Sequence, residues 1–284
     1  FYTLIDRSNG KTIRFATDLY DHAPHFSSVA LHECDFYFKR NYQQEFIKIV
    51  EAEANAQIHK LGITFGSLSN NRCALGKFKT GLFLTNLSLN LKWDRKLVNR
   101  LLKTYRSQKR HWNFTNAARS IERFENFEEP TGDTIMFQTR CFLHEEDKDL
   151  QEIHQQRYRI IKLLRTNFPD TFKGGFVPSK IAKQHYGDAL TNVPTAPEEY
   201  LDAMKKARIV IYTRGLANSP AWKMAEYLSQ GKVIIAEPLT AELPVPLEEG
   251  KELLYFNNDK ELLEKITLVL KDKALAKQLS KNAR

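Results

Sequence analysis

The sequence predicts an α/β protein built from two Rossmann-like domains, and three observations support that fold class. Short apolar runs such as 209–212 and 233–235 are rich in β-branched residues, as expected for parallel strands buried on both faces. Amphipathic helical segments alternate with these runs. The length of 284 residues is too great for one small domain and sufficient for two. An acidic, turn-like stretch at 124–132 predicts the boundary, which gives domains 1–130 and 131–284.

Composition narrows the class of protein. Cys34, Cys73 and Cys141 lack metal-like spacing, so we expect reduced thiols in a cytoplasmic protein. No run approaches the roughly 20 apolar residues that a membrane-spanning helix needs. The 43 Lys and Arg residues exceed the 34 Asp and Glu residues by nine, which suits anionic partners such as nucleotides, acidic membrane surfaces or nucleic acid.

The first domain opens with two predicted strands, 1–5 and 11–16, joined by a turn at Asn9 and Gly10. A hairpin is an unusual start for an α/β domain, so we expect this domain to be truncated, with earlier strands absent or few. The rest of the domain is predicted to contain a strand, a helix and a short strand, at 36–38, 43–60 and 63–65.

A polar cluster follows the second predicted strand, in the loop that contains Asp21, His22 and His25. Loops at strand ends are where α/β enzymes place their chemistry. We therefore name these three side chains as candidate catalytic residues, of which one would face the substrate and act as a general base. The alternative is a structural loop held by aspartate caps, with histidines in solvent.

Two groups of basic residues are ambiguous. Lys39 and Arg40 follow the strand 36–38, where they would either face a bound diphosphate or extend into solvent. The stretch from Lys92 to Arg123 holds ten cations against two carboxylates, with aromatic residues between them. It is interpreted as peripheral membrane contact, as nucleic-acid binding or as a solvated basic helix. We favour the solvated helix, keep membrane contact open and expect no nucleic-acid partner.

The second domain alternates strands and helices. Its predicted strands, besides the two apolar runs above, are 134–139, 172–177 and 253–256. Its predicted helices are 145–166, 197–206, 259–270 and 274–279. Arg140 lies directly after the first of these strands, and Glu237 directly after the strand that begins at Val233, both at the carboxyl edge of a parallel sheet.

The segment from the strand 209–212 to the strand 233–235 predicts a βαβ unit with an anion site. Ser219 and Pro220 read as a helix N-cap and first helical position, and Gly231 as the end of the helix. Such a helix start presents unpaired amides and the positive end of the helix dipole, which together hold a phosphate. Arg214 and Lys223 add positive charge on either side.

This segment resembles the nucleotide-binding half of GT-B glycosyltransferases of the group 1 type, in particular the CgeB-like branch. The resemblance rests on Gly215, Glu226, the run 231–235 (Gly-Lys-Val-Ile-Ile), a proline at 244 or 246 and the run 250–254. It implies a GT-B fold of two Rossmann-like domains, with the acceptor on the first and a nucleotide diphosphate sugar on the second. Many relatives have a glutamate where this chain has Asn218, so the usual contact with the donor sugar differs here.

The resemblance also implies roles for single residues. Glu226 would contact the ribose, Arg140 the diphosphate, and the backbone at Asn192 and Val193 the base. Its place at a strand end, and not the resemblance, indicates that Glu237 would bind sugar hydroxyls or cap a turn. The predicted substrate-binding set is Arg140, Asn192, Val193, Arg214, Gly215, Asn218, Ser219, Lys223, Glu226 and Glu237.

The sequence thus predicts a glycosyltransferase of bacterial-type glycan or glycoconjugate synthesis, with an unknown acceptor. We expect no cofactor, and no metal because no Asp-x-Asp pair stands at a strand end. Two alternatives remain: a nucleotide-sugar epimerase of the same fold, or a non-catalytic basic protein that binds membranes or nucleic acid.

Overall fold

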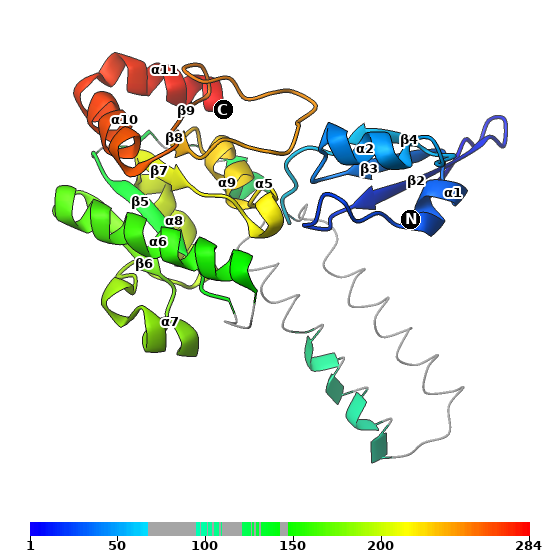
Figure 1. Ribbon diagram of the computed structural model, residues 1–284, viewed down its shortest axis with the longest axis horizontal. Helices are drawn as coiled ribbons and strands as arrows, with labels where there is room; N and C mark the ends of the chain where they lie inside the picture. Colours follow the sequence, from blue (N-terminus) through cyan, green and yellow to red (C-terminus); the bar gives the residue numbers. More distant parts are fainter. Residues whose placement is uncertain are drawn as a thin grey trace.

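The computed structural model describes residues 1–67, 95, 96, 98–100, 102, 103, 105–107, 109, 121–125, 127, 129, 130, 132–142 and 147–284. Most of the basic stretch from Lys92 to Arg123, and Cys73, therefore lie outside the described residues. Two α/β units lie side by side, each built on its own sheet (Figure 1). The first unit holds both β1–β4 and the N-terminus, and the second holds β5–β9 and the C-terminus.

The first unit has a four-stranded sheet in the order β1-β2-β3-β4. Its strands are β1 (Tyr2–Ile5), β2 (Thr12–Asp18), β3 (Phe36–Lys39) and β4 (Gln57–Lys60). Strands β1 and β2 form the predicted antiparallel hairpin, and β2, β3 and β4 are parallel. Helices α1 (Ser28–Glu33) and α2 (Gln44–Val50) connect the parallel strands, and α1 packs on the small core around Tyr37 and Leu31.

The predicted helix 43–60 is wrong in its second half. Helix α2 ends at Val50, and Gln57–Lys60 forms β4 in register with β3. The segment alternates exposed and half-buried side chains, as a strand at a sheet edge does, but its polar residues concealed that pattern. The predicted strand 63–65 is also absent from the described sheets, and Ile63 and Phe65 instead pack against the core of the second unit.

The second unit has a five-stranded, fully parallel sheet in the order β6-β5-β7-β8-β9. Its strands are β5 (Ile135–Thr139), β6 (Phe172–Phe176), β7 (Ile209–Tyr212), β8 (Val233–Ala236) and β9 (Leu253–Tyr255). Successive residues of a strand point to opposite faces. Ile209 and Ile211 accordingly join one apolar layer, and Val210 and Tyr212 join the other.

Helices cover both faces of this sheet (Figure 1). One layer contains α6 (Lys148–Asn167), α7 (Lys180–His185), the short η1 (Gly187–Ala189), α10 (Asp259–Lys271) and α11 (Lys273–Ala283). The other contains α5 (Ile121–Glu125), α8 (Pro197–Lys206) and α9 (Lys223–Ser229). The two α/β units, one with a fully parallel sheet and one with three parallel strands and an antiparallel edge strand, confirm the predicted fold class. Among the described helices, none has the length and apolar character to cross a membrane.

Helix α5 precedes the predicted boundary at 130, yet it packs with the second unit. Phe124 is buried in that unit's core, and the Gln230 side chain donates a hydrogen bond to the Phe124 carbonyl. The Arg284 guanidinium donates to the Glu125 carbonyl at 2.8 Å. The division into 1–130 and 131–284 stays a prediction, and these contacts define which part of the chain must accompany the second unit.

Candidate active site between the two units

A cavity of about 1070 Å³ lies where the carboxyl ends of β5, β6 and β7 meet the first unit. The chain leaves β5 toward β6 on one side, and β7 pairs on the other side of β5. This is the switch point at which open α/β sheets bind their ligands. The charged residues that line the cavity are Asp21, Arg40, Arg140, Asp147, Arg157, Lys180, Lys223 and Glu226.

The helix after β7 begins later than predicted, and the residues from Ser219 onward do not present the predicted row of unpaired amides. Helix α9 starts at Lys223, so Ser219 is not its N-cap and Pro220 is not its first residue. The Ser219 amide donates to the Leu216 carbonyl at 3.0 Å, and the Ala221 amide donates to the Tyr212 hydroxyl at 2.8 Å. Because proline has no amide hydrogen, the predicted row of unpaired donors from Ser219 onward is wrong.

Side-chain cations provide the positive charge instead. Arg140 follows β5 and Lys223 opens α9, and both line the cavity. The Lys223 ammonium donates to the Gln138 carbonyl and lies 5.1 Å from the centre of the Tyr200 ring. The pKa of Lys223 is lowered from its ordinary value to about 8, mainly by burial; Glu226 acts in the opposite direction, and Arg157 and Arg140 add to the lowering.

Glu226 is one turn further along α9 and lies in the same cavity wall. It is 8% exposed and lies in a setting rich in tyrosine, with Tyr200 and Tyr227 among the lining residues. Buried carboxylates are stable only with hydrogen-bonding or charged neighbours. Glu226 and Lys223 therefore place a hydrogen-bond acceptor and a cation close together in the cavity.

Arg157, on α6, was not predicted as a site residue. It is 7% exposed and donates to the Thr213 hydroxyl at 3.3 Å, to the Arg140 carbonyl at 3.4 Å and to the Arg214 carbonyl at 3.1 Å. Burial lowers the pKa of Arg157 to about 10. One sequence signal was present, because Arg157 lies four residues from both Ile153 and Ile161 on the apolar face of its helix.

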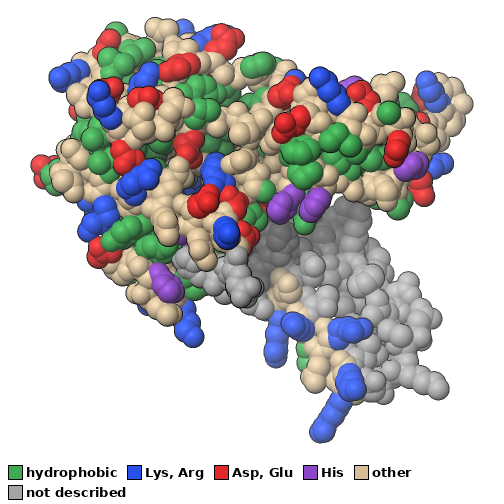
Figure 2. Space-filling model, in the orientation of Figure 1, with side chains coloured by type: hydrophobic (Ala, Val, Ile, Leu, Met, Phe, Trp, Pro, Cys, Tyr) green, Lys and Arg blue, Asp and Glu red, His purple; other side chains and the backbone are tan. Residues whose placement is uncertain are grey.

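Arg214 and Glu237 were both predicted to bind substrate, but their side chains bond to other residues of the protein. The Arg214 guanidinium pairs with Asp149 at 2.5 Å and with Glu152 at 3.7 Å. Glu237 accepts from the Arg214 amide at 2.7 Å and from the Gln156 side chain. Acidic and basic side chains accordingly gather where the two units meet (Figure 2). Arg214 and Glu237 both line a separate hollow of about 110 Å³ beside the main cavity.

The loop after β7 is closely packed. Gly215 lines the main cavity, and a Cβ there would lie 2.7 Å from the Ser219 carbonyl oxygen, so no side chain fits. The short helix η2 (Leu216–Asn218) contains Ala217 and Asn218 in the left-handed region, with φ of 51° and 57°. Asn218 and Ser219 line the small hollow together with Glu237.

Asn192 and Val193, which were predicted to contact the base, do not line the cavity. Val193 is buried in the core, and its amide donates to the Thr191 hydroxyl at 3.0 Å. Asn192 is exposed. Among the described residues that line the cavity, this segment contributes Thr195 and Pro197.

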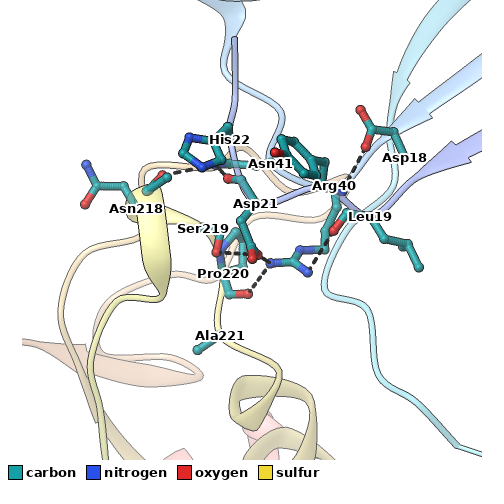
Figure 3. Close-up of polar contacts among 12 residues, drawn as sticks. Asp18, Leu19, Asp21, His22, Arg40, Asn41, Asn218, Ser219, Pro220 and Ala221 are labelled. Atoms are coloured by element: carbon teal, nitrogen blue, oxygen red, sulfur yellow. Dashed lines mark hydrogen bonds and ion pairs between the residues drawn. The ribbon is translucent and has the colours of Figure 1, made fainter. Parts of the chain in front are cut away.

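The first unit contributes Asp21 and Arg40 to the cavity wall. The Arg40 guanidinium pairs with the Asp21 carboxylate and donates to the Pro220 carbonyl of the second unit at 3.3 Å (Figure 3). Of the described residues of this loop, Asp21 alone lines the cavity, while His22 and His25 stack with each other at 5.1 Å between ring centres. The structure thus separates Asp21 from the two histidines.

Comparisons with known proteins link part of the chain to one family. Residues 149–284 match the family described as "Glycosyl transferase-like". No curated protein matches the chain. Among solved structures, the chain is similar to Staphylococcus aureus TarM in complex with Fondaparinux, alpha-GlcNAc-glycerol and UDP (8% identity, TM-score 0.46, 97% of this chain and 47% of that chain). It is also similar to sucrose-phosphate synthase from Thermosynechococcus elongatus (13%, 0.45, 95% and 61%) and to an alpha-glucosyltransferase in complex with UDP (14%, 0.39, 57% and 49%).

The family match confirms the resemblance for the C-terminal part of the chain, which is glycosyl transferase-like. This chain spans about half the length of TarM and of the alpha-glucosyltransferase. The structural similarities are too loose to transfer a ligand or a reaction. The matched region contains α9, Lys223 and Glu226, and Arg140 lies just before it.

Proposed function

We propose that the chain transfers a sugar from a nucleotide diphosphate sugar to an acceptor, with the donor in the cavity between the two units. One observation carries this proposal: Arg140, Lys223 and Glu226 line one cavity at the carboxyl edge of the sheet, and Lys223 and Glu226 belong to the glycosyl transferase-like region. The cavity, at about 1070 Å³, is at the upper end of the range typical of small-molecule sites.

The cations would act on the leaving group. A departing nucleoside diphosphate gains negative charge in the transition state, and fixed cations in a site shielded from water stabilise that charge. Arg140 offers a fork of donors suited to phosphate oxygens, and Lys223 offers a single ammonium near the same strand end, where it donates to the Gln138 carbonyl. Glu226 would accept from a ribose hydroxyl, which orients the nucleotide.

The first unit would supply the acceptor side. Asp21 enters the cavity wall opposite the second unit, and its side chain is 42% exposed. A carboxylate in this position can accept the proton of an acceptor hydroxyl or hold the donor sugar. Because cations already line the cavity, we propose that the reaction proceeds without a divalent metal. Activity unchanged by EDTA would support that proposal, and activity lost and restored by Mg²⁺ would contradict it.

Binding of nucleotides tests the assignment directly. Nucleoside mono- and diphosphates are screened by thermal shift, and hits are measured by calorimetry on Lys223→Met and on the control Lys183→Met, an exposed lysine on α7. We expect diphosphates to bind more tightly than monophosphates, and Lys223→Met to weaken binding about tenfold, or about 1.4 kcal/mol. Equal affinity in both variants, or no binding of any nucleotide, would refute the donor site.

Product analysis separates the alternatives. A transferase consumes donor only when an acceptor is present, apart from slow hydrolysis, whereas an epimerase converts the donor alone into its isomer. Incubation of the identified nucleotide sugar without acceptor, followed by chromatography of the nucleotide sugars, therefore decides between them.

A further inference from the structure

Two adjacent cations lie at the carboxyl end of β3, and their side chains point in opposite directions. Lys39 is the last residue of β3, and Arg40 follows it. Because successive side chains of a strand alternate, Lys39 faces the interior of the first unit, where it is fully buried, and Arg40 faces the second unit. The sequence could not tell which of the two would meet a ligand.

All three N–H groups of the Lys39 ammonium donate to acceptors in the first unit. Its ammonium donates to the Asp18 carboxylate at 2.8 Å, to the His22 carbonyl at 3.1 Å and to the His25 carbonyl at 2.5 Å. An ammonium has three N–H groups, so this set is complete. It also lies 4.7 Å from the centre of the Phe26 ring. Two of the acceptors belong to the main chain of loop 19–27, the loop between β2 and α1.

Tyr37 closes the same network from β3. Its hydroxyl donates to the Asp18 carboxylate at 2.6 Å and accepts from the Ser27 amide at 3.2 Å. Loop 19–27 is therefore held by buried groups at two carbonyls and at one amide near its end. The conformation of the loop is therefore set by Tyr37 and Lys39 of β3.

Asp21 is the residue that this loop presents to the second unit (Figure 3). Its carboxylate accepts from the Ser219 hydroxyl at 3.0 Å and pairs with Arg40. The Asn41 side chain donates to the Asp21 carbonyl at 2.5 Å and to the Ala217 carbonyl at 3.3 Å. The position of Asp21 therefore depends on both its own loop and the segment 217–221 of the second unit, which contacts it directly.

We propose that Lys39 is a positioning residue, which fixes the main chain of loop 19–27 and so sets the Asp21 carboxylate against Ser219 at the cavity wall. Its effect on turnover rests on the proposed function. A buried ion pair stabilises a fold little better than an apolar pair of the same size. A charge that organises two loop carbonyls next to the cavity has a role that an apolar side chain cannot fill.

The kinetic test compares Lys39→Met with Lys48→Met, an exposed lysine of α2 in the same unit. We expect Lys39→Met to lower kcat at least tenfold with the donor KM within twofold of wild type, because the cations of the donor site remain. Lys48→Met should change neither. In an Asp21→Asn background, Lys39→Met should cause little further loss, since the two act through one carboxylate. Losses that multiply independently, or a kcat equal to that of Lys48→Met, would overturn the proposal.

A second measurement needs no substrate and separates this proposal from the proposed function. Hydrogen exchange of peptides that cover 19–27 and 217–221 should accelerate at least tenfold in Lys39→Met, while Asp21→Asn should accelerate only 217–221. If no nucleotide binds, the proposed function fails and exchange alone decides the positioning role. Asp18→Asn, which keeps the side-chain size, is the second variant should Lys39→Met lose its near-UV circular dichroism; it should accelerate the same two peptides. Unchanged exchange in a folded variant would overturn the proposal.

Discussion

The loops that follow β5 and β7 are neighbours, since Arg157 donates to a carbonyl of each, and they use their arginines differently. After β5, Arg140 has an exposed side chain at the cavity, and its carbonyl is held from below by Arg157. After β7, Arg214 is bound to Asp149 and Glu152, and the Ala217 amide donates to Asp149 at 2.8 Å. The first loop leaves its cation exposed at the cavity, and the second uses its cation to maintain its own shape.

This difference shows that a basic residue after a buried strand does not by itself mark an anion site. Both arginines follow parallel strands of the same sheet and lie at the same edge. What separates them is a pair of acidic residues on α6, Asp149 and Glu152, which pair with Arg214. Substitutions in and below the two loops test that distinction.

The largest effect is expected at Arg157, because it joins the two loops. Arg157→Met leaves the carbonyls of Arg140 and Arg214 and the Thr213 hydroxyl without their buried donor. Buried polar groups that lose a partner cost about 1–3 kcal/mol, more where the partner was charged. We therefore expect the free energy of unfolding to fall by about 3 kcal/mol, measured by urea denaturation.

The matched control is Arg159→Met on the same helix. Arg159 is 61% exposed and pairs with Asp259 at 3.0 Å. Exposed ion pairs contribute about 0–1 kcal/mol, so the control should lose less than about 1 kcal/mol. If the two variants unfold at the same urea concentration, Arg157 does not hold the loops.

The next largest effect concerns nucleotide affinity and compares the two arginines. Arg140→Ala removes a cation that lines the cavity, and we expect the dissociation constant for a nucleoside diphosphate to rise about 30-fold, or about 2 kcal/mol. Arg214→Ala should raise it less than fivefold, and only through the shape of its loop. Calorimetry measures both. Equal losses would mean that both loops present their cations to the ligand.

Much of the fold was predictable because the second unit has simple patterns. Uniformly apolar runs gave β7 and β8, and a proline at the first position with an acidic first turn gave α8 its bounds. Strand β4 was missed because its sequence, Gln-Ile-His-Lys, contains three polar residues and pairs as an edge strand. Edge strands depend on a neighbour that no local pattern contains.

The site was predicted only where local order decides position. Arg140 and Lys223 lie at a strand end and a helix start, and the structure places both in the cavity. Arg214 was assigned the wrong surroundings because Asp149 is 65 residues away in the chain. The helix after β7 was started too early because the Ala221 amide bonds to Tyr212, a tertiary contact that overrides the signal of Pro220.

The pH dependence of binding gives an intermediate effect, which depends on Lys223 at the start of α9. Its ammonium donates to the Gln138 carbonyl of β5, and burial lowers its pKa to about 8. A bound diphosphate favours the charged form, so affinity should be constant below about pH 7 and fall as pH rises through 8. The limit is tenfold per pH unit for one proton. Calorimetry from pH 7 to 9.5 should show this fall in wild type and a flat profile in Lys223→Met. A flat wild-type profile would contradict the assignment.

The smallest expected effect is on stability: in the loop after β7, a change from alanine to glycine should stabilise the protein, whereas the same change in a helix should destabilise it. Ala217 has φ of 51°, a left-handed conformation that costs a residue with a Cβ about 1–2 kcal/mol. Glycine removes that cost but adds about 0.5–1 kcal/mol of unfolded-state entropy, so Ala217→Gly should stabilise by up to about 1 kcal/mol. The same change at Ala274, an exposed position of α11, should destabilise by about 1 kcal/mol. Urea denaturation of the two variants should shift the midpoint in opposite directions. A shift in the same direction would show that the loop is not strained and that contacts with Asp149 and Asn41 alone maintain its shape.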